Sequence, residues 1–216
     1  MTGVEIGTAI VSYIEPEPGY ERAFNEWYER DHFPATVLAG PGVFGGARFV
    51  ATRACKQLRS SSATLFGDVA RGSYLAVAWV LPGRQAEWDA WVAREMETIV
   101  AAGRMFPHRE HIQTAVYAFT AATGDVPAPM ALAHGFGGVV ATAGPGPVAA
   151  PATPAVVRLE LDRPILSSCD PGPHELVLAF CHDPVATFHA SDLAAAGFAS
   201  PFVATVPGTD TYTEEL

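Results

Sequence analysis

The stretch that decides the fold is FNEWYERDHFPATVLAGPGVFGGARFV, which runs from Phe24 to Val50. Its first half places Phe24, Trp27 and Asp31 at steps of three and four residues, while charged side chains largely fill the other positions. This periodicity predicts a short amphipathic helix with one buried stripe. Asn25, Tyr28 and His32 are expected to form a partly polar edge beside that stripe.

A proline limits this helix. Pro34 lacks a backbone donor and disfavours the α conformation of the residue before it. The helix is therefore expected to stop or kink at His32, and a second short turn is expected over residues 35–39.

The same residues resemble the dimeric α/β-barrel superfamily, in particular its EthD-like branch. There, a helix of the form FNxWYxxxHxP is followed by a proline-glycine-phenylalanine turn and a strand with an arginine, here Arg48. The resemblance implies a ferredoxin-like βαββαβ unit whose sheet pairs with a second such sheet to close a barrel. It also implies activities of the cofactor-free oxygenase, cyclase, isomerase or dehydratase type on small, often aromatic or polyketide-like compounds, with haem enzymes as a further group.

Hydrophobic patterning beyond this stretch predicts an α+β fold. Strands are expected over 4–14, 45–56, 73–81 and 113–120, with a second helix over 85–102, in the element order of a ferredoxin-like domain spanning 1–123. Residues 124–216 resemble a second, degenerate copy that keeps strands near 131–142, 155–161, 175–181 and 202–206, and a helix within 184–196. The two units together would form one α/β barrel.

Composition narrows the partners. The chain has 216 residues, is 49% hydrophobic and carries a formal charge of −10 without a basic stripe, which argues against nucleic acid and anionic membranes. Cys55, Cys169 and Cys181 form no CxxC pair, and no apolar run reaches membrane-spanning length, so a cytoplasmic protein is expected. The expected partner is a small hydrophobic or aromatic molecule, and a homodimer stays open.

The candidate catalytic residues are His32, Tyr28 and Arg48. An imidazole titrates near working pH and suits a general acid or base, a phenol can donate a proton, and a guanidinium can hold an enolate-like oxygen. Each also has a structural interpretation: His32 as a helix cap, and Arg48 as one half of an ion pair.

Candidate substrate-binding residues come from the same helix and from two later segments. Their side chains are aromatic, amide or imidazole groups that could converge at a barrel mouth, although core packing or plain exposure explains them as well. They are Trp27, Asn25, Trp79, His108 and His111.

No cofactor is expected. A metal site of His32, His108 and His111 can be drawn, but two histidines three residues apart in a predicted loop are a common coincidence. Haem ligation by His134, His174, His182 or His189 rests on the superfamily resemblance alone. Two hypotheses follow: a cofactor-independent enzyme acting by acid–base chemistry in a barrel cavity, or a non-catalytic small-molecule-binding or structural protein.

Overall fold

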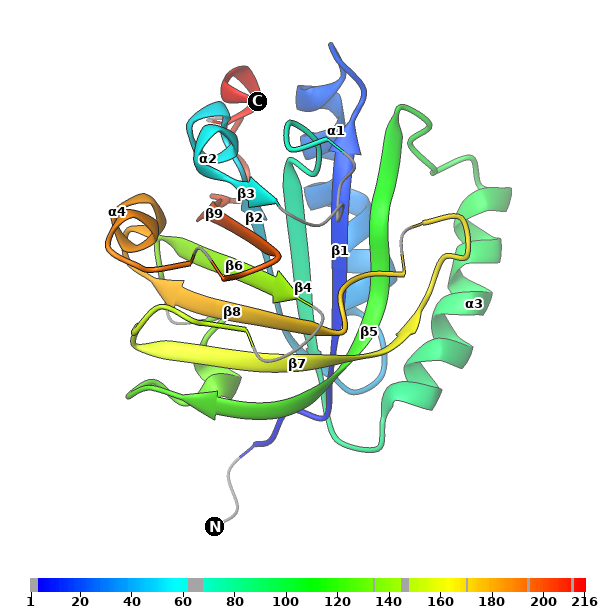
Figure 1. The fold of residues 1–216 in the computed structure, drawn as a ribbon. Coiled ribbons are helices and arrows are strands. Elements are labelled where there is room, and N and C mark those ends of the chain that lie inside the picture. The colour runs from blue at the N-terminus through cyan, green and yellow to red at the C-terminus, as the bar shows by residue number, and fades with distance from the viewer. Residues whose placement is uncertain are drawn as a thin grey trace.

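The chain folds into a closed antiparallel β-barrel with few helices (Figure 1). The computed structural model describes residues 4–61, 68–133, 135–144, 148–169, 171–193, 195–210 and 212–216. Eight strands follow one another around the barrel in the order β2-β4-β1-β5-β7-β8-β6-β9, and β9 pairs with β2 to close it. The strands are β1 (Thr8–Pro16), β2 (Val43–Val50), β4 (Tyr74–Val80), β5 (Arg109–Thr123), β6 (Gly138–Gly144), β7 (Ala155–Pro164), β8 (Glu175–Cys181) and β9 (Phe198–Ala204), with the short β3 (Ser60–Ser61) added beside β9.

Closure between β2 and β9 is brief. Only Phe49 and Val50 pair with β9, opposite Ala204 and Val203. The preceding residues of β2 pair with β4 on one side, but none of them pairs with β9 within the described register. The barrel therefore has one short seam.

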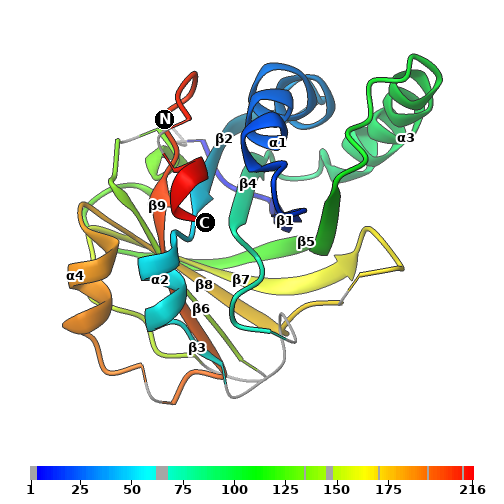
Figure 2. The same ribbon diagram turned by 90° about the horizontal axis from the view of Figure 1, so that it is seen from above.

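Helices cover the outer face of the first four barrel strands, where α1 (Glu21–Trp27) and α3 (Gln85–Ala101) lie on the same side (Figure 2). Phe24 of α1 packs against Tyr74 of β4, and Trp88 of α3 packs with Ile10 of β1. The short α4 (Pro184–His189) lies away from them, and Phe188 packs on a second apolar cluster of the outer face.

The barrel interior is filled by side chains. Alternate strand residues point inward, and the largest of them are completely buried, as expected for a small barrel. They include Tyr13, Trp79, Tyr117, Phe180 and Phe202. We expected the site in a cavity inside the barrel, whereas the pocket that His32 lines lies on the outer face of β1 and β5.

Pro34 does not end the first helix. The chain continues through two π-helical segments, η1 (Tyr28–His32) and η2 (Pro34–Leu38), and Phe33 between them keeps helical angles of φ −63° and ψ −45°. The wider turns connect residues five apart: Phe33 N donates to Tyr28 O, and Ala39 N to Pro34 O. Such π-type turns accommodate a residue that cannot join the α-helical ladder, and they are frequent at functional sites.

Other boundaries also differ from the sequence prediction. The expected strand over 45–56 ends at Val50, because Thr52 accepts a hydrogen bond from Cys55 N and begins α2 (Arg53–Leu58). β5 begins at Arg109 rather than at residue 113, so His111 belongs to a strand and not to a loop. The expected strand over 131–142 begins only at Gly138.

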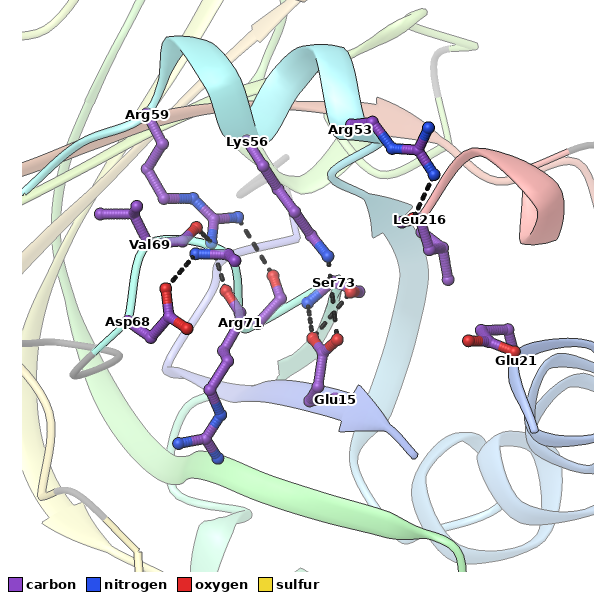
Figure 3. Close-up of polar contacts among 12 residues, drawn as sticks. Glu15, Glu21, Arg53, Lys56, Arg59, Asp68, Val69, Arg71, Ser73 and Leu216 are labelled. Carbon is purple, nitrogen blue, oxygen red and sulfur yellow. Dashed lines mark hydrogen bonds and ion pairs between the residues drawn. The ribbon is translucent and has the colours of Figure 1, made fainter. Parts of the chain in front are cut away.

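Figure 3 shows the basic side chains of α2, Arg53 and Lys56, together with Arg59, which follows the helix. The Arg59 guanidinium donates hydrogen bonds to Ser200 Oγ and to the carbonyls of Val69, Arg71 and Gly72. It also lies over the rings of the interior residues Phe198 and Phe202. None of the helices in the described ranges is both long and apolar enough to cross a membrane.

Candidate functional site

A pocket of about 540 Å³ lies between the helices and the outer face of β1 and β5. We call it the histidine pocket. Its walls come from η1, η2, α3, the two strands and the end of β7 with the residues that follow it. The lining residues are Ile10, Ser12, Tyr28, His32, Thr36, Val37, Trp88, Asp89, Val92, Ala93, Met96, Met105, Arg109, His111, Thr114, Arg163, Pro164, Ile165 and Leu166.

A β-bulge in β5 builds the polar side of this pocket. Tyr13 of β1 pairs with Gln113 and Ile14 pairs with His111, so Ile112 is an extra residue in the ladder. An extra residue reverses the alternation of the strand. His111 and Thr114, three positions apart, therefore both face the histidine pocket, while Gln113 faces the barrel interior.

The His111 ring is held at both nitrogens. Arg109 Nε donates to His111 Nε2 at 3.3 Å, and His111 Nδ1 lies 2.9 Å from Thr114 Oγ1. Because Thr114 Oγ1 donates its own hydrogen to Gln113 O, the consistent arrangement has the His111 proton on Nδ1. Burial, then the charge of Arg109, lowers the pKa of His111 to about 4.

His32 lies at the wall of the pocket and is only 8% exposed. Its ring stacks on Trp27 with centroids 4.5 Å apart, and its Nδ1 is buried with no hydrogen-bond partner among the described residues. Burial, with the charges of Arg109 and His111, lowers the pKa of His32 to about 3. The ring is therefore neutral near about pH 7, and Nε2 is the nitrogen left for a ligand.

Arg109 supplies the positive charge of this cluster. Its guanidinium lies 4.8 Å from the Trp27 ring centroid, and no carboxylate within the described ranges forms an ion pair with it. The phenol of Tyr28 also lines the pocket; burial, opposed by the charges of Arg48 and Arg109, raises the pKa of Tyr28 to about 12. The polar side thus combines one cation, two neutral imidazoles and one protonated phenol.

The rest of the pocket is mainly apolar, and residues 163–166 from the second half of the chain form part of its wall. Ile165 N donates to Thr114 O at 2.8 Å, and Arg163 forms an ion pair with Asp89 of α3. Arg163 pairs with Val116 of β5, which lies five residues beyond His111. At the rise of a β-strand, the backbone positions of His111 and Val116 are roughly 16 Å apart, so Arg163 and His111 lie at opposite ends of the pocket.

The structure brings three of the predicted site residues to this pocket and a fourth beside it. Tyr28, His32 and His111 line the pocket, and Trp27 lies behind His32, where its Nε1 donates to Arg104 O at 2.7 Å. Asp31 pairs with Arg104 and does not orient the imidazole.

The other predicted residues lie elsewhere. Trp79 points into the barrel interior and is completely buried. His108 stacks on Tyr20 at 3.7 Å and its Nδ1 lies 2.9 Å from Glu17 Oε2. Asn25 is buried and donates to Thr209 O.

Arg48 is also outside the histidine pocket. Its Nη1 lies 3.0 Å from Glu29 Oε1 and donates to Asn25 Oδ1, and its guanidinium lies 4.6 Å from the Tyr28 ring centroid. A carboxylate and an aromatic ring therefore stabilise the buried Arg48 guanidinium beneath the helix, while its Nη2 has no hydrogen-bond partner among the described residues.

Sequence reasoning missed three parts of the pocket lining: Arg109, Thr114 and residues 163–166. Arg109 and His111 differ by two positions, which is strand spacing, so a strand beginning at Arg109 would have placed them on one face. The bulge that adds Thr114 to that face leaves no sequence signal. Neither does the contact between Arg163 and α3, which joins residues 74 positions apart.

The metal and haem alternatives gain no ligand set. His108 does not join His32 and His111, and no group of three or more His, Cys, Asp or Glu side chains suited to a metal occurs in the described part of the chain. Among the drawn haem ligands, His134 lies outside the described residues, and His174 lies 3.4 Å from Glu160 on the surface.

Comparisons with known proteins give only distant structural similarities. No family model matches the chain, and no curated protein does. Among solved structures, a crystal structure of an anthrone oxidase-like protein matches with a TM-score of 0.46 and 8% identity, covering 94% of this chain and 92% of that one. A similarity of this size carries no functional assignment.

Proposed function

We propose that the chain is a cofactor-independent enzyme that moves a proton on a small hydrophobic or aromatic carbonyl compound in the histidine pocket. The observation that carries this proposal is the convergence of His32, His111 and Arg109 on one side of a mainly apolar pocket, where Arg109 forms no ion pair with a carboxylate of the described residues. Apolar pockets with a few convergent polar groups of shifted pKa are typical of active sites.

The reaction step follows from these groups. His32 Nε2 takes the proton from a carbon next to the carbonyl, the C–H electron pair forms the C=C bond, and the carbonyl π pair moves onto oxygen. Arg109 faces that enolate oxygen, and Tyr28 can donate a hydrogen bond to it. His32 then returns the proton to another carbon or to a leaving hydroxide. Isomerisation, dehydration and cyclisation start from this enolate, as does oxygenation with O₂ as the co-reactant.

The low pKa of His32 is compatible with this role. Burial and the charge of Arg109 oppose protonation of His32. An enolate formed beside Arg109 neutralises that charge and stabilises the imidazolium, so His32 becomes a stronger base as the reaction proceeds.

The proposal can be tested without knowing the natural substrate. 2-Tetralone is an apolar bicyclic ketone, and exchange of its α-hydrogens in D₂O can be followed by proton NMR. We expect the protein to accelerate exchange and His32→Ala to reduce that acceleration by about 100-fold or more. His108→Ala is the matched control, because this histidine lies outside the pocket, and it should exchange like wild type.

Two results would count against catalysis. If His32→Ala stays within a few-fold of wild type, His32 is not the base. If 2-tetralone binds but exchanges no faster than in buffer, the non-catalytic binding protein is the better description.

We also propose that the chain consists of two ferredoxin-like units, 1–123 and 124–216, of the dimeric α/β-barrel type with an EthD-like first unit. In support, β2-β4-β1-β5 and β7-β8-β6-β9 share one arrangement, because each quartet has its second, third, first and fourth strand in that order. α4 stands where the second helix of such a unit belongs. On this proposal the second unit takes the place of a partner subunit, so a homodimer is not needed to close the barrel.

A further inference from the structure

A second pocket, of about 570 Å³, lies at the barrel seam. We call it the seam pocket. The π-helical segment η1 separates it from the histidine pocket: Tyr28 and His32 line the histidine pocket, whereas Glu29 lines the seam pocket.

The walls of the seam pocket are mostly apolar. Phe33 and Leu38 come from the helical side, Phe49 from β2, and Leu132 and Phe136 from the segment before β6. A pocket of this composition favours a ligand with an apolar body.

Arg48 and Glu29 supply the polar part of the lining. Their side chains are 4% and 10% exposed, and Arg48 Nη1 lies 3.0 Å from Glu29 Oε1. Arg48 Nη2 nevertheless has no hydrogen-bond partner among the described residues. Glu29 Oε1 also has none there, because its contact with Arg48 Nη1 is an ion pair without hydrogen-bond geometry. Both atoms are almost inaccessible to solvent, and buried unsatisfied groups are costly. A ligand that reached the pair from the pocket would accept a hydrogen bond from Nη2 and donate one to Oε1.

The part of β2 that does not pair with β9 contributes backbone groups to the seam pocket. Arg48 O accepts hydrogen bonds from Thr205 N and Thr205 Oγ1, so Arg48 directs its main chain toward the seam. Gly46 lies two residues earlier on the same edge, lines the pocket and has no partner in the β2–β9 register. Alternation along the strand therefore turns the Gly46 main chain toward the seam as well.

We propose that the seam pocket binds a neutral, largely apolar molecule carrying an amide group. An anion is attracted by Arg48 but repelled by Glu29, and a cation experiences the reverse, so the pair selects an uncharged group. An amide offers a donor and an acceptor together, which matches both the Arg48–Glu29 pair and a strand edge. This inference is independent of the chemistry proposed for the histidine pocket.

The test uses three probes with one ring system: 2-naphthamide, 2-naphthoate and 2-naphthylmethylammonium, titrated by calorimetry. We expect the amide to bind wild type at least about tenfold more tightly than either ion. Leu132→Trp fills the seam pocket and should weaken amide binding by at least about tenfold. The matched control Met96→Trp fills the histidine pocket instead and should leave amide binding within about twofold.

Glu29→Gln provides a sharper test because it keeps the shape of the side chain while removing its charge. Arg48 is then uncompensated, and the preference should change from the amide to 2-naphthoate. Circular dichroism verifies that each variant is folded. Absence of saturable amide binding to wild type, binding abolished by Met96→Trp rather than Leu132→Trp, or an unchanged amide preference in Glu29→Gln would each overturn the proposal.

Discussion

Arg109 donates a hydrogen bond from Nε to Nε2 of His111 across 3.3 Å, so a permanent cation lies against an imidazole that must remain neutral to accept it. The pair is held at the wall of the histidine pocket, close enough to His32 for both groups to lower its pKa. Any change to Arg109 should therefore be detected at both histidines.

Arg109→Met tests this coupling. Removal of the positive charge should raise the pKa of His111 above about 4 and that of His32 above about 3, because one cause that opposes protonation of each ring is lost. Burial still opposes protonation of both, and His111 and Arg104 still oppose protonation of His32. NMR titration of the imidazole resonances measures both values. Arg94→Met, which removes a charge at an exposed position of α3, is the control. Equal titration curves in wild type, Arg109→Met and Arg94→Met would contradict the coupling.

Stability should depend on pH through the same two histidines. Their folded pKa values lie below the ordinary 6.5, so the unfolded chain binds protons more readily. Their contribution is complete above 6.5 and is lost as the pH falls toward 4 and 3. Urea unfolding at several pH values in that range measures how the free energy of unfolding changes with pH. His32→Leu should reduce this pH dependence by up to about 1.4 kcal/mol per pH unit. A slope equal to that of wild type would show that His32 is not held neutral by the fold.

Thr114→Val removes the hydroxyl that orients His111 while keeping the size of the side chain. We expect a loss of about 1 kcal/mol in the free energy of unfolding, because the buried Nδ1–H then has no acceptor. Under the proposed function, α-hydrogen exchange of 2-tetralone should also slow. Thr120→Val, at an exposed position of the same strand, controls for the substitution itself.

Arg59 should be the most sensitive residue of α2 and its C-terminal end. Its guanidinium donates hydrogen bonds to three backbone carbonyls, including those of Val69 and Arg71 (Figure 3), and to Ser200 Oγ. Burial lowers the pKa of Arg59 to about 10. Arg59→Met leaves those acceptors without donors, and we expect a loss of roughly 3–5 kcal/mol in urea unfolding. Arg53→Met, at an exposed contact with Leu216, should change stability by less than about 1 kcal/mol.

Local pattern was sufficient for much of the fold. α3 and β8 follow directly from helical periodicity and from a continuous apolar run. The first helix was predicted correctly up to its end, where the sequence rule for Pro34 was too strict: a π-helical turn changes which carbonyl needs a donor, and this depends on packing against β4 rather than on local preference.

The site was predictable only in part, for a similar reason. Tyr28 and His32 were identified because an unusual helix carries them, but the partners of His32 depend on strand phase and on contacts between distant segments. Arg48 has a residue type suited to catalysis, yet its position on the outer face of β2 under Tyr28 gives it a buried carboxylate instead. Nothing in the neighbouring residues distinguishes these two environments.

The histidine pocket is lined by residues from both halves of the chain. His32 and Arg109 come from the first half of the chain, whereas Arg163, Ile165 and Leu166 come from the second. Separately expressed fragments 1–123 and 124–216 would each hold an incomplete binding surface, and the site would reappear only when the two pieces reassociate. Under the proposed function, a ligand would therefore bind only where both halves of the chain are present.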